Sequence, residues 1–275
     1  MKGPGKLGFV LVGLAIACVP TPGLGQAARR ERRPLGECLQ ALSKRFGVAI
    51  EAAREPGSIP GAAGRPGGPL LTWTAAGEAE YLDYVAIFEG ALAKYPPALL
   101  RAAGLRKFVW CTGIVGDRVG RDKSGLFLAG DATIYLDVRI GKQVPGGRRF
   151  TVHHEVFHAI DFRVDRSFDD KDWEAISGAG AYDRRASASA PPGDRPTDLG
   201  VLERGAGFMT SYSRSEVRED KAELFACMMA LPIFVESRMK DEPPMVRKVR
   251  RMEALIKQAC PGLADDFWAS PARDK

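Results

Sequence analysis

Hydrophobic positions recur at helical spacing in several stretches of the chain. The clearest stripe repeats every three or four residues and ends before a Pro-Pro pair: Tyr81, Tyr84, Val85, Phe88, Leu92 and Tyr95. Such spacing places one apolar face on a helix, so we expect these aromatic residues to pack in the core. A short helix is expected over 34–46, and two more over 216–230 and 244–259.

Shorter runs rich in β-branched and aromatic residues predict strands. They lie at 48–50, Lys107–Cys111 and Ala132–Ile140. Gly146-Gly147 then leads into a segment that begins strand-like and becomes helical.

Two stretches lack apolar periodicity. Residues 56–69 hold nine Gly or Pro in fourteen positions, which indicates a flexible connection. Residues 177–200 consist mainly of Ala, Ser, Gly, Pro and Asp, which is typical of an exposed insertion. We therefore expect an N-terminal segment with its linker over 28–75 and one larger domain over 76–275.

Residues 1–27 have the pattern of a signal peptide. Lys2 and Lys6 precede a short apolar run that ends at Cys18, and small residues offer a cleavage site before Ala28. The apolar run is short for a membrane span, so none is expected in the mature chain. We predict an exported protein, whether secreted, periplasmic or on the cell surface. A lipid anchor at Cys18 and an uncleaved anchor remain alternatives.

Composition agrees with a globular protein and excludes few partners. Hydrophobic residues make up 45% and charged residues 27% of the chain. Of the formal charge of +6, two positive charges lie in the predicted signal peptide, which leaves about +4 for the mature chain. No basic stripe interleaved with aromatic residues occurs, so a nucleic-acid partner is not expected.

Four cysteines follow the predicted signal peptide: Cys38, Cys111, Cys227 and Cys260. An even number in an oxidising compartment permits disulfides in three pairings, between which the sequence does not choose. Buried free thiols are an equally weighted alternative. None forms a Cys-x-x-Cys pair, so all four are poor zinc ligands.

The candidate chemistry lies where all three histidines of the chain gather. The run His-Glu-Val-Phe-His at 154–158 has the H-E-x-x-H pattern. Residues i and i+4 share a helix face, so His154 and His158 can bind one zinc ion. Glu155 is rotated by roughly 100° and can act as general base on a metal-activated water. His153 is expected to be a packed or surface histidine.

The alternative is a helix that carries two histidines by chance. Its neighbours are apolar: Val152, Val156, Phe157, Ile160 and Phe162. In a buried helix, uncompensated Glu and His side chains would be costly. A metal relieves that cost, because it binds neutral imidazoles and places a cation beside the carboxylate. We therefore predict Zn²⁺ as the cofactor.

Zinc needs a third protein ligand beside an open position for water. No histidine remains, so this ligand must be a carboxylate or a thiolate, and the stretch 210–226 is the obvious source. Glu219 and Glu223 are spaced i, i+4 on the predicted helix, whereas Glu216 lies near its start, where an acid favours capping. Lys221 is expected to face solvent.

Two blocks of this region resemble a known family. The first is H-E-x-x-H-A-x-D from 154, and the second is T-S-Y-x-R from 210 followed by E-x-x-A-E from 219. Together they are similar to the catalytic domain of anthrax toxin lethal factor and to the wider group of lethal-factor-like zinc peptidases. The 60 residues between His158 and Glu219 include the polar insertion and are not aligned. Nothing resembles the toxin's receptor-binding part, so no toxin delivery is inferred.

The resemblance implies a role for each matching residue. Glu219 would be the third zinc ligand, and Tyr212 would stabilise the tetrahedral intermediate. Glu223 would support the ligands from behind. Asp161 could orient a ligand imidazole.

These observations predict an α+β fold of zincin-like type, with helices around a small mixed sheet and the two motif helices side by side at the metal. The expected function is hydrolysis of peptide or protein substrates by a zinc metalloendopeptidase. By analogy, Leu126–Val138 would supply an edge strand for an extended substrate. Two alternatives stay open: a non-catalytic zinc-stabilised binding module, and a zinc hydrolase of a non-peptide amide in the cell envelope.

Overall fold

The computed structural model describes residues 33–59, 71–116, 122–142, 146–166, 168–183, 207–263 and 267–268. The predicted signal peptide and most of the predicted insertion over 177–200 lie outside these residues. Contacts divide the chain between Arg33 and Pro34, and the description concerns the second unit.

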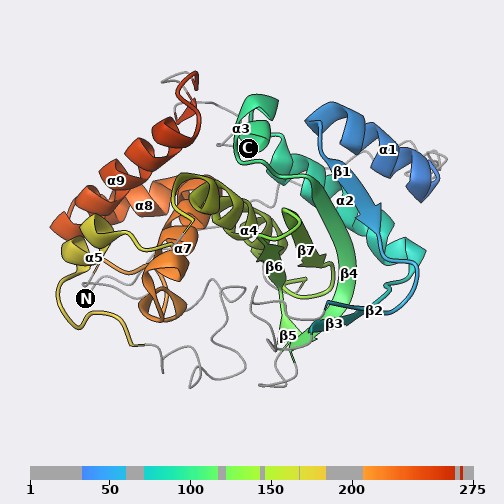
Figure 1. Cartoon of the computed structure of the whole chain (residues 1–275), viewed down its shortest axis with the longest axis horizontal. Helices are drawn as coiled ribbons and strands as arrows, with labels where there is room; N and C mark the ends of the chain where they lie inside the picture. Colours follow the sequence, from blue (N-terminus) through green and yellow to red (C-terminus); the bar gives the residue numbers. More distant parts are fainter. Residues whose placement is uncertain are drawn as a thin grey trace, which may run out of the picture. The chain divides into compact units, whose positions relative to one another are not determined.

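Helices pack around a small mixed sheet, which confirms the predicted α+β class (Figure 1). The strands are β1 (Ala49–Ala52), β2 (Gly57–Ile59), β3 (Leu71–Thr74), β4 (Lys107–Gly116), β5 (Asp122–Lys123), β6 (Gly125–Leu128) and β7 (Thr133–Asp137). The helices are α1 (Leu35–Phe46), α2 (Glu78–Leu92), α3 (Pro97–Ala102), α4 (Gly147–Val164), α5 (Lys171–Ser177), the 3-10 turn η1 (Tyr212–Arg214), α7 (Val217–Ala230), α8 (Pro232–Met239) and α9 (Pro243–Ala259).

The long strand β4 organises the sheet. Its first half pairs in parallel with β1 on one side and β7 on the other. Its second half pairs antiparallel with β3 and β5. β6 pairs antiparallel with β7 and ends the strand order β2-β3-β4-β7-β6, so one of its sides is an open edge in the part of the chain described.

Strand β7 ends three residues earlier than predicted, because Asp137 turns the chain. Its Oδ1 accepts hydrogen bonds from the backbone N–H groups of Arg139 at 2.8 Å and Ile140 at 3.0 Å. Its Oδ2 accepts another from Gly113 at 2.6 Å. A carboxylate that binds the following backbone favours a turn over a continued strand.

The aromatic stripe of α2 packs in the core, as its spacing predicts. Phe88 lies edge-on against Phe108 and Trp110 of β4, with ring centroids 4.9 and 5.0 Å apart. All three side chains are fully buried. This packing joins α2 to the sheet, and α4 packs in turn against α2, α7, α9 and β6.

Two adjacent charges of α7 are buried, which was not expected. Lys221 is fully buried and donates a hydrogen bond from Nζ to Asp161 Oδ1 at 2.7 Å. The prediction that Lys221 faces solvent is therefore wrong, because α4 provides a carboxylate for it. Asp220 accepts hydrogen bonds on Oδ2 from Lys248 Nζ at 2.7 Å and Trp173 Nε1 at 2.8 Å. These bonds tie α7 to α4, α5 and α9.

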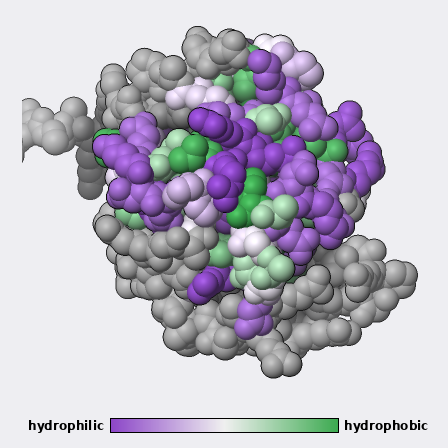
Figure 2. Space-filling model, turned by 90° about the vertical axis from the view of Figure 1, so that its left-hand side faces the viewer, coloured by the Kyte–Doolittle hydropathy of each residue, from purple (hydrophilic) through white to green (hydrophobic). Residues whose placement is uncertain are grey.

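Cys111, Cys227 and Cys260 are buried free thiols. The structure thus agrees with the free-thiol alternative. No helix among the described residues is long and apolar enough to cross a membrane. Figure 2 shows a face on which hydrophilic side chains predominate and hydrophobic ones are scattered.

Candidate metal centre

The H-E-x-x-H run lies on α4, as predicted. The helix begins after Gly146, whose φ of 80° is in the left-handed region that glycine tolerates. Its middle turns are buried almost completely, and His154, Glu155 and His158 are 6%, 5% and 9% exposed. The apolar neighbours of the motif form this buried helix, so the polar side chains lie where solvent cannot fully satisfy them.

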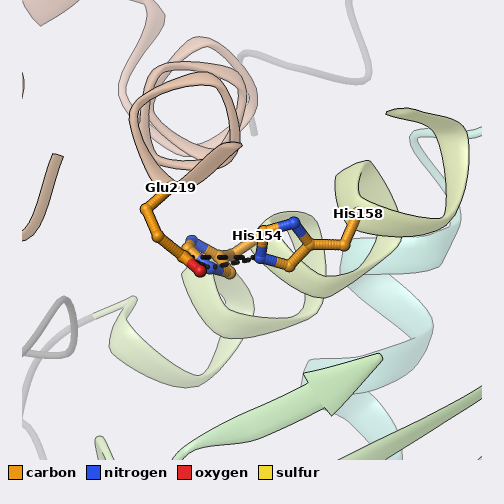
Figure 3. A group of neighbouring side chains, drawn as sticks. All are labelled: His154, His158 and Glu219. Atoms are coloured by element: carbon orange, nitrogen blue, oxygen red, sulfur yellow. Dashed lines mark hydrogen bonds and ion pairs between the residues drawn. The ribbon is translucent and has the colours of Figure 1, made fainter. Parts of the chain in front are cut away.

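His154, His158 and Glu219 meet at one point (Figure 3). The two imidazole Nε2 atoms are 3.0 Å apart, and Glu219 Oε2 lies 3.2 Å from that of His154 and 3.4 Å from that of His158. Ligands around a tetrahedral zinc at about 2.0–2.1 Å are separated by about 3.3 Å. The three atoms therefore have the chemistry and the spacing of a zinc ligand set.

Glu219 reaches the centre from the first turn of α7. Burial alone would raise the pKa of this carboxyl, but the neighbouring His158 and His154 lower it well below its usual value. Its other oxygen, Oε1, lies 3.2 Å from Nε of Arg218. A cation therefore holds the oxygen that does not face the imidazoles. Sequence patterns assign no role to Arg218, and its position next to Glu219 is the signal that could have found it.

The second ring nitrogen of His154, Nδ1, faces a carboxylate on α7. Its Nδ1 lies 2.8 Å from Glu223 Oε1, and Glu223 Oε2 accepts a hydrogen bond from Thr210 Oγ1 at 2.8 Å. A carboxylate behind an imidazole fixes the ring and directs Nε2 at the metal. Burial would lower the pKa of His154, but Glu219 and Glu223 raise it well above the usual value. Thr210 is a further residue to which the sequence assigned no role.

Glu155 lies at the edge strand. An added Cβ at Gly125 of β6 would be only 2.6 Å from its Cγ, so the strand passes closely only because residue 125 has no side chain. Burial raises the pKa of Glu155, against the lowering effect of His154 and His158. A raised carboxyl pKa suits a general base that works near neutral pH.

Tyr212 lies in the turn η1, which packs against the start of α7. Its ring centroid is 6.2 Å from that of His154. Burial, followed by the charge of Glu219, raises its pKa well above the usual value. The hydroxyl is therefore protonated at neutral pH and available as a donor beside the ligand set.

Two residues lie away from the three ligand atoms. Asp161 Oδ1 pairs with Lys221, and no hydrogen bond joins Asp161 to an imidazole within the described ranges. His153 is fully buried, and its Nδ1 lies 2.6 Å from the hydroxyl oxygen of Tyr95. Burial lowers its pKa to about 3, so the ring is neutral. Of the two expected alternatives, a packed or a surface histidine, His153 is thus the packed one.

The fold is similar to that of a protein of known structure. It resembles the crystal structure of a protein from Bacteroides caccae, described as "a putative zinc-binding metallo-peptidase", with a TM-score of 0.50 and 15% sequence identity. The match covers 90% of this chain and 97% of the other. At that identity the likeness concerns the fold, which is consistent with a zincin-like architecture. A scan of family models and a search of curated proteins find no match.

Proposed function

We propose that this chain is a zinc-dependent metallopeptidase, exported from the cell, that hydrolyses internal bonds of peptide or protein substrates. His154, His158 and Glu219 would hold the zinc. Membership of the lethal-factor-like peptidases belongs to the same proposal. The carrying observation is the ligand triangle, whose edges of 3.0, 3.2 and 3.4 Å correspond to one tetrahedral ion.

The geometry supports a separate role for each residue around that ion. When bound, zinc would supply a Lewis acid that activates water and polarises the scissile carbonyl. The Glu155 carboxylate would accept the proton of the attacking water and pass it to the leaving amine. The Tyr212 hydroxyl would donate to the oxyanion. Glu223 and Thr210 would keep the His154 ring in place.

The edge strand supports a peptide as the substrate. β6 offers backbone donors and acceptors on its open side, and it passes beside Glu155 at Gly125. An extended peptide can add to such an edge as a further strand, which presents its backbone to the general base. This arrangement favours a peptidase over a zinc module with a structural role.

The test combines zinc content with peptide cleavage. The full chain is loaded with zinc, and its metal content is measured by atomic absorption. A proteome-derived peptide pool is then digested and read by mass spectrometry, using wild type, Glu155→Gln and the control Glu253→Gln, whose side chain is exposed on α9. We expect about one zinc per chain in all three proteins. Cleavage should fall by about 10²–10⁴-fold in Glu155→Gln alone.

The other outcomes separate the alternatives. Zinc in every protein with no peptide cleavage in any would contradict the peptidase and favour a binding module. If amide bonds of envelope fractions are cleaved while peptides are not, the zinc hydrolase of a non-peptide amide is favoured. Absence of zinc from wild type after loading would contradict all three zinc functions.

A further inference from the structure

A cavity of about 310 Å³ lies beside the C-terminal end of α4 and the turn that joins β6 to β7. Its lining includes three arginines, one acid and two aromatic rings: Arg106, Arg163, Arg166, Asp131, Phe127 and Phe162. We name it the arginine pocket. We propose that it is a substrate subsite that binds an acidic side chain of the peptide, two to four residues on the N-terminal side of the cleaved bond. This inference rests on the proposed peptidase function.

The charges of the arginine pocket are not neutralised from within. The lining holds three arginines and one acid, Asp131, and all four residues are exposed. No ion pair joins Arg106, Arg163 or Arg166 to a carboxylate in the residues that the structure describes. An exposed arginine by itself is usually only solvated, and Arg163 near a helix C-terminus also favours the helix dipole. Three arginines that line one cavity, however, can bind a carboxylate together through planar donor groups.

A continuous aromatic wall connects the arginine pocket to the metal centre. The ring of His158 lies 6.5 Å from that of Phe168, which lies 5.5 Å from that of Phe162. Phe162 contacts Phe127 of β6 at 6.0 Å, and the guanidinium of Arg166 lies 5.6 Å above the Phe162 ring. One row of aromatic contacts therefore links the metal centre to the arginine pocket.

Helix geometry gives the spacing between the two sites. Phe162 lies one turn beyond His158 on α4, about 6 Å further along the helix direction. The helix ends at Val164, about 9 Å beyond His158, and Arg166 follows this end. An extended peptide advances about 3.3 Å per residue. The acidic side chain would therefore be two to four residues from the scissile bond.

The direction of β6 gives the side of that bond. The strand runs from Gly125, beside Glu155, towards Leu128 and the pocket. Antiparallel pairing is the more stable and more frequent arrangement of strands. An antiparallel peptide would pass the arginine pocket first and Glu155 afterwards, which places the acid on the N-terminal side.

The experiment places an acidic residue at each position of a cleaved peptide in turn. A blocked decapeptide that the zinc-loaded full chain cleaves is resynthesised with Glu or Gln at each position on both sides of the cleaved bond, and kcat/KM is measured. We expect kcat/KM to be about tenfold higher for Glu than for Gln at one or more of the positions two to four residues N-terminal to the cleaved bond. The difference should arise mainly from KM. The preference should weaken as NaCl is raised, because the arginines are exposed.

Variants assign that preference to the pocket. The double variant Arg163→Gln/Arg166→Gln should lose the preference, so that kcat/KM becomes equal for the Glu and Gln peptides. Arg166→Glu should favour a Lys peptide at the same position. Arg250→Gln, which changes an exposed arginine on α9, should keep the wild-type preference. Equal kcat/KM for Glu and Gln peptides in wild type, or a preference only on the C-terminal side, would overturn the proposal while leaving the peptidase intact.

A binding measurement keeps the subsite testable if catalysis fails. Fluorescein-labelled Glu and Gln peptides are titrated against Glu155→Gln, with and without the double arginine change, and followed by anisotropy. Tighter binding of the Glu peptide that disappears with the arginines supports the subsite even without turnover. Equal binding of both peptides overturns it.

Discussion

Consecutive residues of α7 face two buried polar regions. The two regions differ in how their buried charges are compensated. Asp220 and Lys221 find their partners within the protein, since Lys248 and Asp161 each lie 2.7 Å away. Glu219, one residue earlier, faces two imidazoles, which are neutral when they act as metal ligands. Arg218 reaches only its outer oxygen, Oε1.

The difference indicates which region is built for a ligand. Buried charges persist when they are paired within the protein or coordinate a metal. The lysine pairs satisfy the first condition, and the donor set at Glu219 fits the second. Buried polar groups therefore do not by themselves identify a functional site. The informative feature is a set of metal-donor atoms that converge on one point.

The largest expected effect comes from breaking the internally paired region. Lys221→Met would leave Asp161 buried without its cation, and should lower the free energy of unfolding by about 3–5 kcal/mol. Adding Asp161→Asn should restore part of the loss, because the remaining amide is uncharged. Urea unfolding measures both. Lys240→Met, an exposed matched control, should change stability little. A loss in Lys221→Met no larger than in this control would show that the pair is not a structural requirement.

At the metal centre, the expected stabilisation comes from an added cation. Zinc at about a thousand times its dissociation constant should raise the free energy of unfolding by about 4 kcal/mol in wild type. His154→Ala should lose this effect. Because the ligands bind zinc in their deprotonated forms, the stabilisation should fall as the pH is lowered from about 8 to 5. Thermal unfolding with and without zinc measures it, and an equal shift in His154→Ala would contradict the assigned ligand set.

Tyr212→Phe separates chemistry from metal binding at that centre. It removes only the hydroxyl proposed to donate to the oxyanion, so kcat should fall by about a hundredfold with zinc content and unfolding temperature unchanged. Tyr182→Phe is the matched control, since that hydroxyl bonds to Asp220, in the other region. Unchanged kcat in Tyr212→Phe would remove the residue from the mechanism.

Local patterns predicted much of the fold. The stripe of α2 and the helix over 244–259 appear close to their expected bounds, because helix periodicity depends on near neighbours. The prediction of a strand over 107–111 found only the first half of β4. Its second half is defined by β3 and β5, and pairing between distant segments is not contained in a local pattern.

Contacts between distant segments also limited the prediction of the metal centre. The i, i+4 spacing was sufficient to place His154 and His158 together on one face of α4. Glu219 lies 65 residues from His154 and was chosen through a family resemblance. The burial of Lys221 could not be foreseen, because Asp161 is 60 residues away and only the packing of α4 on α7 brings them together. The catalytic roles of Glu155 and Tyr212 stay predictions.

The smallest expected effect comes from an ion pair that is not buried. Glu80 binds Arg139 through both oxygens, at 2.6 and 2.8 Å, with side chains 31% and 53% exposed. Hydrogen bonds from Arg139 and from the backbone of Gly77 lower the pKa of Glu80 from 4.5 to about 2. A depressed carboxyl pKa adds stability that is present above about pH 4.5 and is lost as the pH falls towards 2.

Glu80→Gln should therefore cost less than about 1 kcal/mol at pH 7, because solvent screens an exposed pair. The difference from wild type should shrink as the pH is lowered below 4.5. Urea unfolding at a series of pH values measures it, with Glu78→Gln in the same helix turn as control. A loss as large as that of Lys221→Met would contradict the view that burial, and not ion pairing as such, makes the charges of α7 so costly to disrupt.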